Sequence, residues 1–266
     1  METKIYTINL KNATDTIYLE PLGCIHIGNV NFNKEKFEAR IEAIKKDPNR
    51  YWIGMGDYGD SITVSNTTTD KRFSWRTIDR KVLTPDEQFD YVEDSFKPIT
   101  SKCLGLLEGN HDWKLIDKTT HGYVQKMAKN LDVSWLKLAS FITLRFVHKG
   151  DLLHRVLLFA AHGQYKGGQT GGNLSFLENL PSRFDADIYL TGHTHNAFTA
   201  ETQILSVDEH GHLVHQPRIF ASTGSFLEGY VQGNMSYVEY GLKRATKTGT
   251  ITIAFQPSEK KMFTIQ

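Results

Sequence analysis

The sequence has few cysteines, almost no net charge and no long apolar segment. Two cysteines, Cys24 and Cys103, are too few for a disulfide framework and are compatible with a reducing compartment. The 31 Lys and Arg residues nearly balance the 30 Asp and Glu residues, so binding of nucleic acid would need a local basic patch. Because no segment resembles a signal peptide or a membrane span, we expect a cytoplasmic protein without a membrane partner.

The remaining composition is that of a globular domain. Hydrophobic residues make up 39% of the 266 residues and charged residues 23%, which is enough apolar material for a sizeable core. No internal repeat and no linker-like stretch divides the chain. We therefore predict a single domain over residues 1–266.

A short apolar run that ends in glycine and polar residues occurs five times. Such runs are typical of buried strands, and ligands bind at the carboxyl ends of strands in α/β sheets. We therefore expect the five polar clusters to share one sheet edge. The runs are 17–22, 51–55, 103–107, 155–161 and 187–190, and the clusters that follow them are 23–26, 56–57, 108–112, 162–163 and 191–195.

Other segments have their own patterns. Apolar residues at helical spacing predict one helix over 33–46, which completes a β-α-β unit, and another over 173–180. Residues 61–88 mix aromatic and basic side chains, and they form either a substrate-facing lid or a packed helical insert. Alternating apolar residues near the end of the chain predict antiparallel strands within 218–266.

The polar clusters contain side chains that bind divalent metals. In Gly192-His193-Thr194-His195, the two imidazoles can each reach a different ion of a two-metal centre. The Asp57 carboxylate can bridge two ions. Three further donors follow other strands, namely His26, Asn110 and His162. Each alone would be an ordinary loop residue, but their occurrence at successive strand ends favours a metal centre.

These motifs, taken in order, resemble the calcineurin-like metallophosphoesterase superfamily. They read Gly-x-x-His, Gly-Asp-x-x-Asp, Gly-Asn-His-Asp, His-Gly and Gly-His-Thr-His, and they extend from Gly23 to His195. The glycine-rich stretch 163–172, followed by Asn173, resembles the phage and prophage members in particular, which implies host cytoplasm as the location. The resemblance implies an α/β fold, a four-layer α/β/β/α sandwich with two central mixed sheets and the metal site at one sheet edge.

The resemblance also implies two divalent metal ions and their ligands. One ion would be held by Cys24, His26, Asp57 and His195, and the other by Asp57, Asn110, His162 and His193. Cys24 departs from the family pattern, which has an aspartate at this position. Our hypothesis is that the Cys24 thiolate binds the metal, which favours Mn, Zn or Fe and disfavours Mg. The alternative is a buried cysteine that does not bind metal, beside a weakened first site.

The implied reaction is metal-dependent hydrolysis of a phosphate ester by a hydroxide that bridges the two metals. His111 is the candidate to protonate or stabilise the leaving group, and Asp112 the candidate to orient His111 and raise its pKa. Asp60 is expected to support the site without binding metal. Trp113 and Tyr165 are candidates for stacking on a base, although aromatic residues more often serve packing.

The Gly-Asn-His-Asp form favours a phosphodiester substrate, which would be DNA, RNA or a nucleotide. Two alternatives remain open. One is a phosphomonoesterase that acts on phosphoprotein or a small metabolite, and the other is a catalytically weak metal-binding scaffold, to which only Cys24 points.

Overall fold

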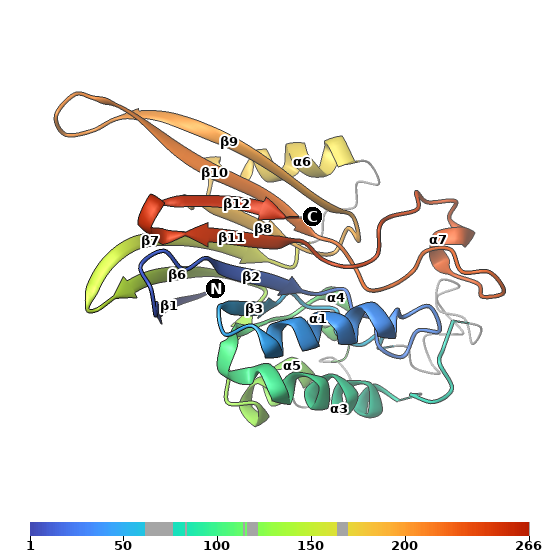
Figure 1. The fold of residues 1–266 in the computed structure, drawn as a ribbon. Helices are drawn as coiled ribbons and strands as arrows, with labels where there is room; N and C mark the ends of the chain where they lie inside the picture. The colour runs from blue at the N-terminus through green and yellow to red at the C-terminus, as the bar shows by residue number, and fades with distance from the viewer. Residues whose placement is uncertain (62–76, 83, 114, 116–121, 164–169, 266) are drawn as a thin grey trace.

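The computed structural model describes residues 1–61, 77–82, 84–113, 115, 122–163 and 170–265, and it contains two six-stranded mixed sheets (Figure 1). Sheet A contains β1 (Glu2–Asn9), β6 (Ala139–His148), β7 (Asp151–Ala161), β8 (Ile188–Thr191), β9 (Ala197–Val207) and β10 (Leu213–Thr223), in the order β1-β6-β7-β8-β10-β9. Sheet B contains β2 (Ile17–Leu22), β3 (Arg50–Gly54), β4 (Cys103–Leu107), β5 (Trp135–Lys137), β11 (Thr252–Gln256) and β12 (Lys261–Ile265), in the order β12-β11-β2-β3-β4-β5.

The described residues also form six α-helices. They are α1 (Lys34–Lys46), α3 (Pro85–Phe96), α4 (Asn110–Trp113), α5 (Tyr123–Asn130), α6 (Thr170–Glu178) and α7 (Tyr237–Tyr240), with 3-10 turns at Lys97–Lys102, Leu180–Ser182 and Pro257–Glu259. Figure 1 shows α1, α3 and α5 on the side of sheet B and α6 on the side of sheet A. None of the helices in the described ranges has the length and apolar character needed to cross a bilayer.

Three apolar clusters hold the four layers together. The inner faces of the two sheets meet through buried side chains such as Ile53 and Leu158. Phe37 of α1 and Phe89 of α3 pack against sheet B, and Leu177 of α6 belongs to the cluster that covers sheet A. Full burial of each such side chain contributes roughly 1.5–3 kcal/mol. The predicted α/β/β/α sandwich with two mixed sheets is confirmed, while the single-domain organisation stays a prediction.

Helix α1 forms where the spacing predicts it. The Asn33 side chain accepts a hydrogen bond of 2.9 Å from the backbone N–H of Lys36, which caps the first turn. Phe37 and Ile44 face the core, and the basic residues Lys45 and Lys46 lie in the last turn, where they complement the helix dipole. The second predicted helix, over 173–180, is α6, which begins three residues earlier at Thr170.

The five predicted strands are present, but they belong to two sheets. Strands β2, β3 and β4 pair in parallel in sheet B, and β7 and β8 pair in parallel in sheet A. The prediction that all five clusters share the edge of one sheet is therefore wrong. Parallel pairing aligns the carboxyl ends within each sheet, and the face-to-face packing brings the two sets of ends together.

Two predicted segments differ from the observed elements. In 218–266, β11 and β12 are antiparallel as predicted, whereas β10 starts earlier, at Leu213, and pairs in parallel with β8. Of the predicted lid or insert over 61–88, residues 62–76 and 83 lie outside the described residues. The backbone N–H of Asp79 donates to the carbonyl of Gly28, and α3 starts at Pro85. The choice between lid and insert stays a prediction.

Candidate metal centre

Most of the predicted metal ligands have an unusual backbone conformation. Five of the seven have a positive φ in the left-handed region. For a residue other than glycine, this conformation raises the free energy of the folded state by roughly 1–3 kcal/mol, and it persists only where the surrounding structure enforces it. Such residues are Cys24, His26, Asp57, His193 and His195, with φ between 47° and 67°. Strain of this kind gathers at functional sites. The turns that follow β2, β3 and β8 are therefore shaped to direct side chains.

Hydrogen bonds between the turns maintain this conformation. The backbone N–H groups of Cys24 and Ile25 donate to the carbonyls of Gly56 and Asp57, both at 2.9 Å, which joins the turns after β2 and β3. The N–H of Gly192 donates to the carbonyl of His162 at 3.0 Å, which joins the ends of β7 and β8. These hydrogen bonds therefore join the four turns in two pairs, one at the end of each sheet.

One group of donors combines Cys24, His26 and His195. One ligand atom from each lies within 4.8 Å of the others, and Nε2 of His26 is 3.0 Å from Nε2 of His195. Burial and the neighbouring His26 hold the pKa of His195 well below its usual range, so its imidazole is neutral. Neutral imidazole is the form that binds metal, and two ring nitrogens that face each other beside a thiol fit a divalent ion. These residues fit the first of the predicted ions.

A second group surrounds Asn110. Its side-chain oxygen lies 2.7 Å from Nδ1 of His193 and 3.2 Å from Nε2 of His162. Burial and the positive charge of His162 lower the pKa of His193 to about 4, which keeps this imidazole neutral. These three residues fit the second predicted ion.

Asp57 lies between the two groups. Its Oδ2 is 3.2 Å from Nε2 of His162. One carboxylate oxygen of Asp57 also lies within 4.8 Å of ligand atoms of both Cys24 and His162, so it is close to a member of each group. Although burial opposes ionisation, the imidazoles of His162 and His111 hold the pKa of Asp57 well below its usual range. An ionised carboxylate between two donor groups has the position required of a bridging ligand. Bridging by Asp57 stays a prediction.

The Cys24 side chain is fully buried within the site. Its Sγ accepts a hydrogen bond of 3.3 Å from the backbone N–H of His193. Burial and the negative charge of Asp57 raise the pKa of the Cys24 thiol, so a bound cation would have to displace its proton. The position fits a ligand, and ligation by Cys24 stays a prediction.

Asp60 supports two of the histidines. Its Oδ1 is 3.1 Å from Nδ1 of His26, and its other oxygen accepts a hydrogen bond of 2.9 Å from the Asn29 amide. A carboxylate on Nδ1 fixes the ring orientation and leaves Nε2 for a metal. The backbone carbonyl of Asp60 lies 2.8 Å from Nδ1 of His111. Asn29, which has no sequence signal of its own, holds Asp60. Asp60 can also form a donor group with His26 and His111, so its role as a support that does not bind metal stays a prediction.

The role predicted for Asp112 is wrong. Its Oδ2 accepts hydrogen bonds from the backbone N–H groups of Asp57 at 2.7 Å and Gly109 at 2.8 Å, and its Oδ1 accepts one from Tyr58 at 3.2 Å. Both carboxylate oxygens therefore hold the turn that carries Asp57, while Asp60 contacts the His111 ring. Burial and the charge of Asp57 raise the pKa of Asp112 to about 8, against the effect of the N–H donors.

The carboxy-terminal quarter contributes more than the sequence indicated. The Ser225 hydroxyl and the Phe226 backbone N–H both donate to the carbonyl of Cys24, at 2.8 and 3.0 Å, and so hold the turn after β2.

Of the two residues predicted to stack on a base, Trp113 is 48% exposed at the end of α4. Tyr165 lies outside the described residues. Stacking by either residue stays a prediction.

Residues 22–197 match the family described as Calcineurin-like phosphoesterase. The match covers about two thirds of the chain, from the end of β2 to the start of β9, and the chain belongs to this family. The protein is therefore a phosphoesterase of a family that uses divalent metal ions, and its described residues contain the donor groups for them. No curated protein matches the chain.

Solved structures with remote similarity include other phosphoesterases. A metallophosphoesterase from Sphaerobacter thermophilus is 14% identical, with 94% of this chain and 89% of that chain covered and a TM-score of 0.40. A conserved uncharacterised protein of Streptococcus pneumoniae, titled a predicted phosphoesterase, is 13% identical, with coverage of 91% and 84% and a TM-score of 0.36. Because these scores are low, the family membership rests on the sequence match.

Proposed function

We propose that this protein hydrolyses phosphodiesters, in nucleic acid or in nucleotides, at a binuclear metal centre. The observation that carries the proposal is the position of His111, which lies next to the donor Asn110, edge-on to His26 with ring centroids 4.7 Å apart. When bound, two divalent cations make a nucleophile from water at neutral pH and polarise the phosphate oxygens. The residues that would hold them are Cys24, His26, Asp57, Asn110, His162, His193 and His195.

The His111 ring is oriented for proton transfer. Its Nδ1 lies 2.8 Å from the carbonyl oxygen of Asp60, an acceptor, so Nδ1 carries a proton, and exchange with the substrate would take place at Nε2. The Asp60 carboxylate, with Oδ1 3.6 Å from the same Nδ1, stabilises the protonated ring. His111 therefore donates a proton to the departing alkoxide of the substrate, which a diester with a poor leaving group requires.

The backbone N–H of His111 has a separate task. It donates a hydrogen bond of 2.8 Å to Oδ1 of Asp57, so the residue that carries the proposed acid also orients the proposed bridging ligand. A substitution that changes only the ring preserves this backbone contact. His111→Ala therefore separates loss of the acid from loss of the metal site.

The experiment compares bis-p-nitrophenyl phosphate with p-nitrophenyl phosphate. Metal-stripped protein is reconstituted separately with Mn, Zn, Fe and Mg, and His111→Ala is assayed beside His212→Ala, an exposed histidine between β9 and β10. We expect metal-dependent turnover of bis-p-nitrophenyl phosphate. Hydrolysis of a dinucleoside phosphate, whose alkoxide leaving group needs the proton, should fall by about 10²–10⁴-fold in His111→Ala and not in His212→Ala. Faster turnover of the monoester would favour the phosphomonoesterase, and inactivity with every metal would favour the scaffold.

The same reconstitution experiment identifies the metals, because it compares turnover with Mn, Zn, Fe and Mg. We propose Mn, Zn or Fe as the cations, because a thiolate donor at Cys24 disfavours Mg. The likeness to phage-encoded members, the cytoplasmic location and the kind of phosphodiester stay predictions.

A further inference from the structure

Residues 228–249 form a small lobe around α7, which follows β10. Figure 1 shows α7 and the loops on either side of it projecting from the body of the protein. Val238 packs against the backbone of Gly229, where an added Cβ would lie 2.8 Å from the Val238 side chain. The Ser236 hydroxyl caps the helix, because it accepts a hydrogen bond of 3.0 Å from the backbone N–H of Glu239. This segment, the α7 lobe, therefore has packing of its own.

The α7 lobe starts and ends beside the metal centre. Ser225 precedes the lobe, and its hydroxyl donates to the carbonyl of the proposed ligand Cys24. The carbonyl of the same Ser225 accepts a hydrogen bond of 2.7 Å from the backbone N–H of Gly249, the last residue of the lobe. The N–H of Glu228, the first residue, donates to the carbonyl of Asn31 at 2.9 Å. Both ends of the lobe are thus fixed to the turn after β2.

The surface of the α7 lobe combines apolar and cationic side chains. Tyr240 is 75% exposed and Leu242 is 87% exposed. Residues 240–249 contain no Asp or Glu, although the whole chain has a net charge of only +1. The cations of this stretch are all exposed, and they are Lys243, Arg244 and Lys247. The lobe therefore provides the local basic patch that binding of nucleic acid requires.

These side chains define the chemistry of a partner. Clustered cations attract a polyanion, and an exposed tyrosine ring offers a flat face on which a base can stack. The faces of the bases are covered in a duplex, so stacking on Tyr240 requires a single strand. An anionic membrane would attract the same cations, but the metal centre next to the lobe is proposed to act on phosphodiesters. A single-stranded nucleic acid is therefore the partner that the observations favour.

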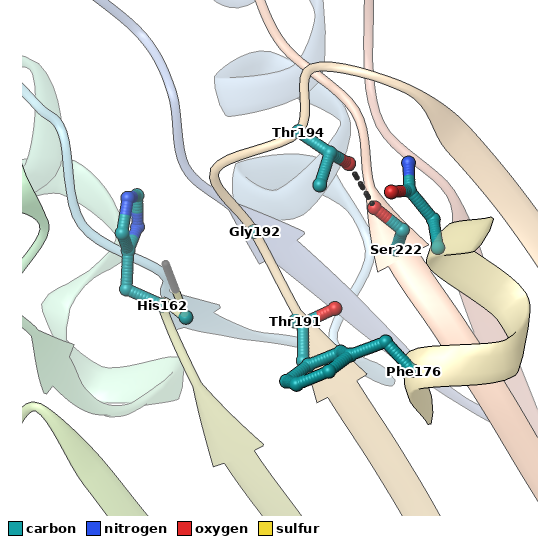
Figure 2. Close-up of a pocket in the computed structure, with 8 residues that line it drawn as sticks. His162, Phe176, Thr191, Gly192, Thr194 and Ser222 are labelled. Atoms are coloured by element: carbon teal, nitrogen blue, oxygen red, sulfur yellow. Dashed lines mark hydrogen bonds between the residues drawn. The ribbon is translucent and has the colours of Figure 1, made fainter. Parts of the chain in front are cut away.

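The pocket beside the metal centre does not offer an alternative place for a base. It is lined by His162 and Phe176 among other residues (Figure 2). Its volume is about 10 Å³, which is room for about one water molecule. An open surface such as that of the α7 lobe suits a chain of nucleotides that extends beyond the reacting phosphate.

We propose that the α7 lobe binds single-stranded nucleic acid, with Tyr240 stacking on a base and the three cations Lys243, Arg244 and Lys247 contacting phosphates. The proposal rests on the phosphodiesterase function proposed above, and it names single-stranded DNA or RNA as the substrate class. The bound strand lies along the lobe and reaches the metal centre at the turn after β2.

The test is fluorescence anisotropy of a labelled twenty-nucleotide oligodeoxythymidine and of the matching oligouridine. The parent protein is manganese-loaded His111→Ala, in which cleavage of the probe is slowed. We expect Tyr240→Ala in this parent to weaken binding about fivefold or more, which is the effect of losing one base stack. Tyr240→Phe retains the aromatic face and should bind as the parent does. The strand that binds more tightly identifies DNA or RNA as the substrate.

Removal of the cations tests the phosphate contacts. Each contact to a single strand contributes about 0.7 to the slope of log affinity against log salt. The triple variant Lys243→Gln, Arg244→Gln and Lys247→Gln should therefore lower this slope by about two. A matched control makes the same change of charge at other exposed lysines and should keep the slope of the parent. The control substitutions are Lys45→Gln, Lys46→Gln and Lys149→Gln.

A duplex of the same length should bind more weakly than the single strand. The inference is overturned if neither strand binds, if Tyr240→Ala binds the strands as tightly as the parent, or if the duplex binds more tightly. Binding to phosphatidylglycerol vesicles without binding to either strand would also overturn it and assign the lobe to a membrane surface. Turnover of bis-p-nitrophenyl phosphate by the wild type tests the underlying function separately, since its absence would remove the reaction but leave the strand-binding site.

Discussion

Gly109 has no side chain because Asp57 occupies the space that a side chain would need. A Cβ built on Gly109 would lie 2.1 Å from Oδ1 of Asp57 and 2.4 Å from its backbone nitrogen, whereas ordinary contact starts at 3.4 Å. Gly109→Ala must therefore displace the Asp57 carboxylate or its turn by about 1.3 Å. Overpacking of this kind costs roughly 1–3 kcal/mol of stability.

The displacement should affect chemistry more than folding. A misplacement of about 1 Å in a catalytic arrangement can lower the rate about 10²-fold, and Asp57 is the proposed bridge between the ions. We expect Gly109→Ala to remain folded, to bind metal more weakly and to lose about 10²-fold in turnover of bis-p-nitrophenyl phosphate at saturating manganese. The assays are calorimetric metal titration, urea unfolding and steady-state hydrolysis.

The control is Gly171→Ala in α6, where no atom of the described residues lies within 4 Å of the added Cβ. This variant should be as stable as the wild type or more stable, because alanine favours helix over glycine by about 1 kcal/mol. If Gly109→Ala kept wild-type metal affinity and turnover, Asp57 would not be the bridging ligand in the arrangement described above.

Three further predictions concern single side chains of the site. Cys24→Ala should lose one zinc site in a calorimetric titration, and unchanged stoichiometry and affinity would show that the thiol is not a ligand. Asp60→Asn should weaken metal binding by roughly 10–100-fold, because a supporting group on His26 is altered, and wild-type affinity would contradict that role. The pKa of His193 is lowered from 6.5 to about 4, so the folded state binds fewer protons than the unfolded state in this window. The contribution of His193 to the stability of the metal-free protein should therefore decrease as the pH falls from about 6.5 to about 4, and His193→Gln should reduce the slope of the urea midpoint against pH.

Local signals were sufficient to predict the elements that carry the site. The bounds of β2 and β4 coincide with the predicted runs 17–22 and 103–107, because an apolar run closed by glycine or acidic residues defines a short buried strand on its own. The Asn33 cap and the spacing of Phe37 and Ile44 defined α1 in the same way. The division of the donors between two ions was implied by the family resemblance and stays a prediction.

Long-range pairing is what the sequence did not reveal. Strand β1 pairs in parallel with β6, which lies more than a hundred residues later in the chain. The sequence of neither strand identifies the other as its partner. The division of the five strands between two sheets depends on such pairings. The prediction that Asp112 orients His111 was wrong for a similar reason. Asp112 is next to His111 in the sequence, but its carboxylate accepts hydrogen bonds from the turn after β3.

The proposed ligands come from both sheets, with Cys24, His26, Asp57 and Asn110 after strands of sheet B and His162, His193 and His195 after strands of sheet A. The separation of the ligands is therefore set by the thickness of the apolar layer between the sheets, which acts as a spacer. A truncation such as Leu158→Ala in that layer touches neither metal nor substrate, yet it lets one sheet approach or slide along the other. The volume of the side chains between the sheets thus helps to determine the distances between the metal ligands.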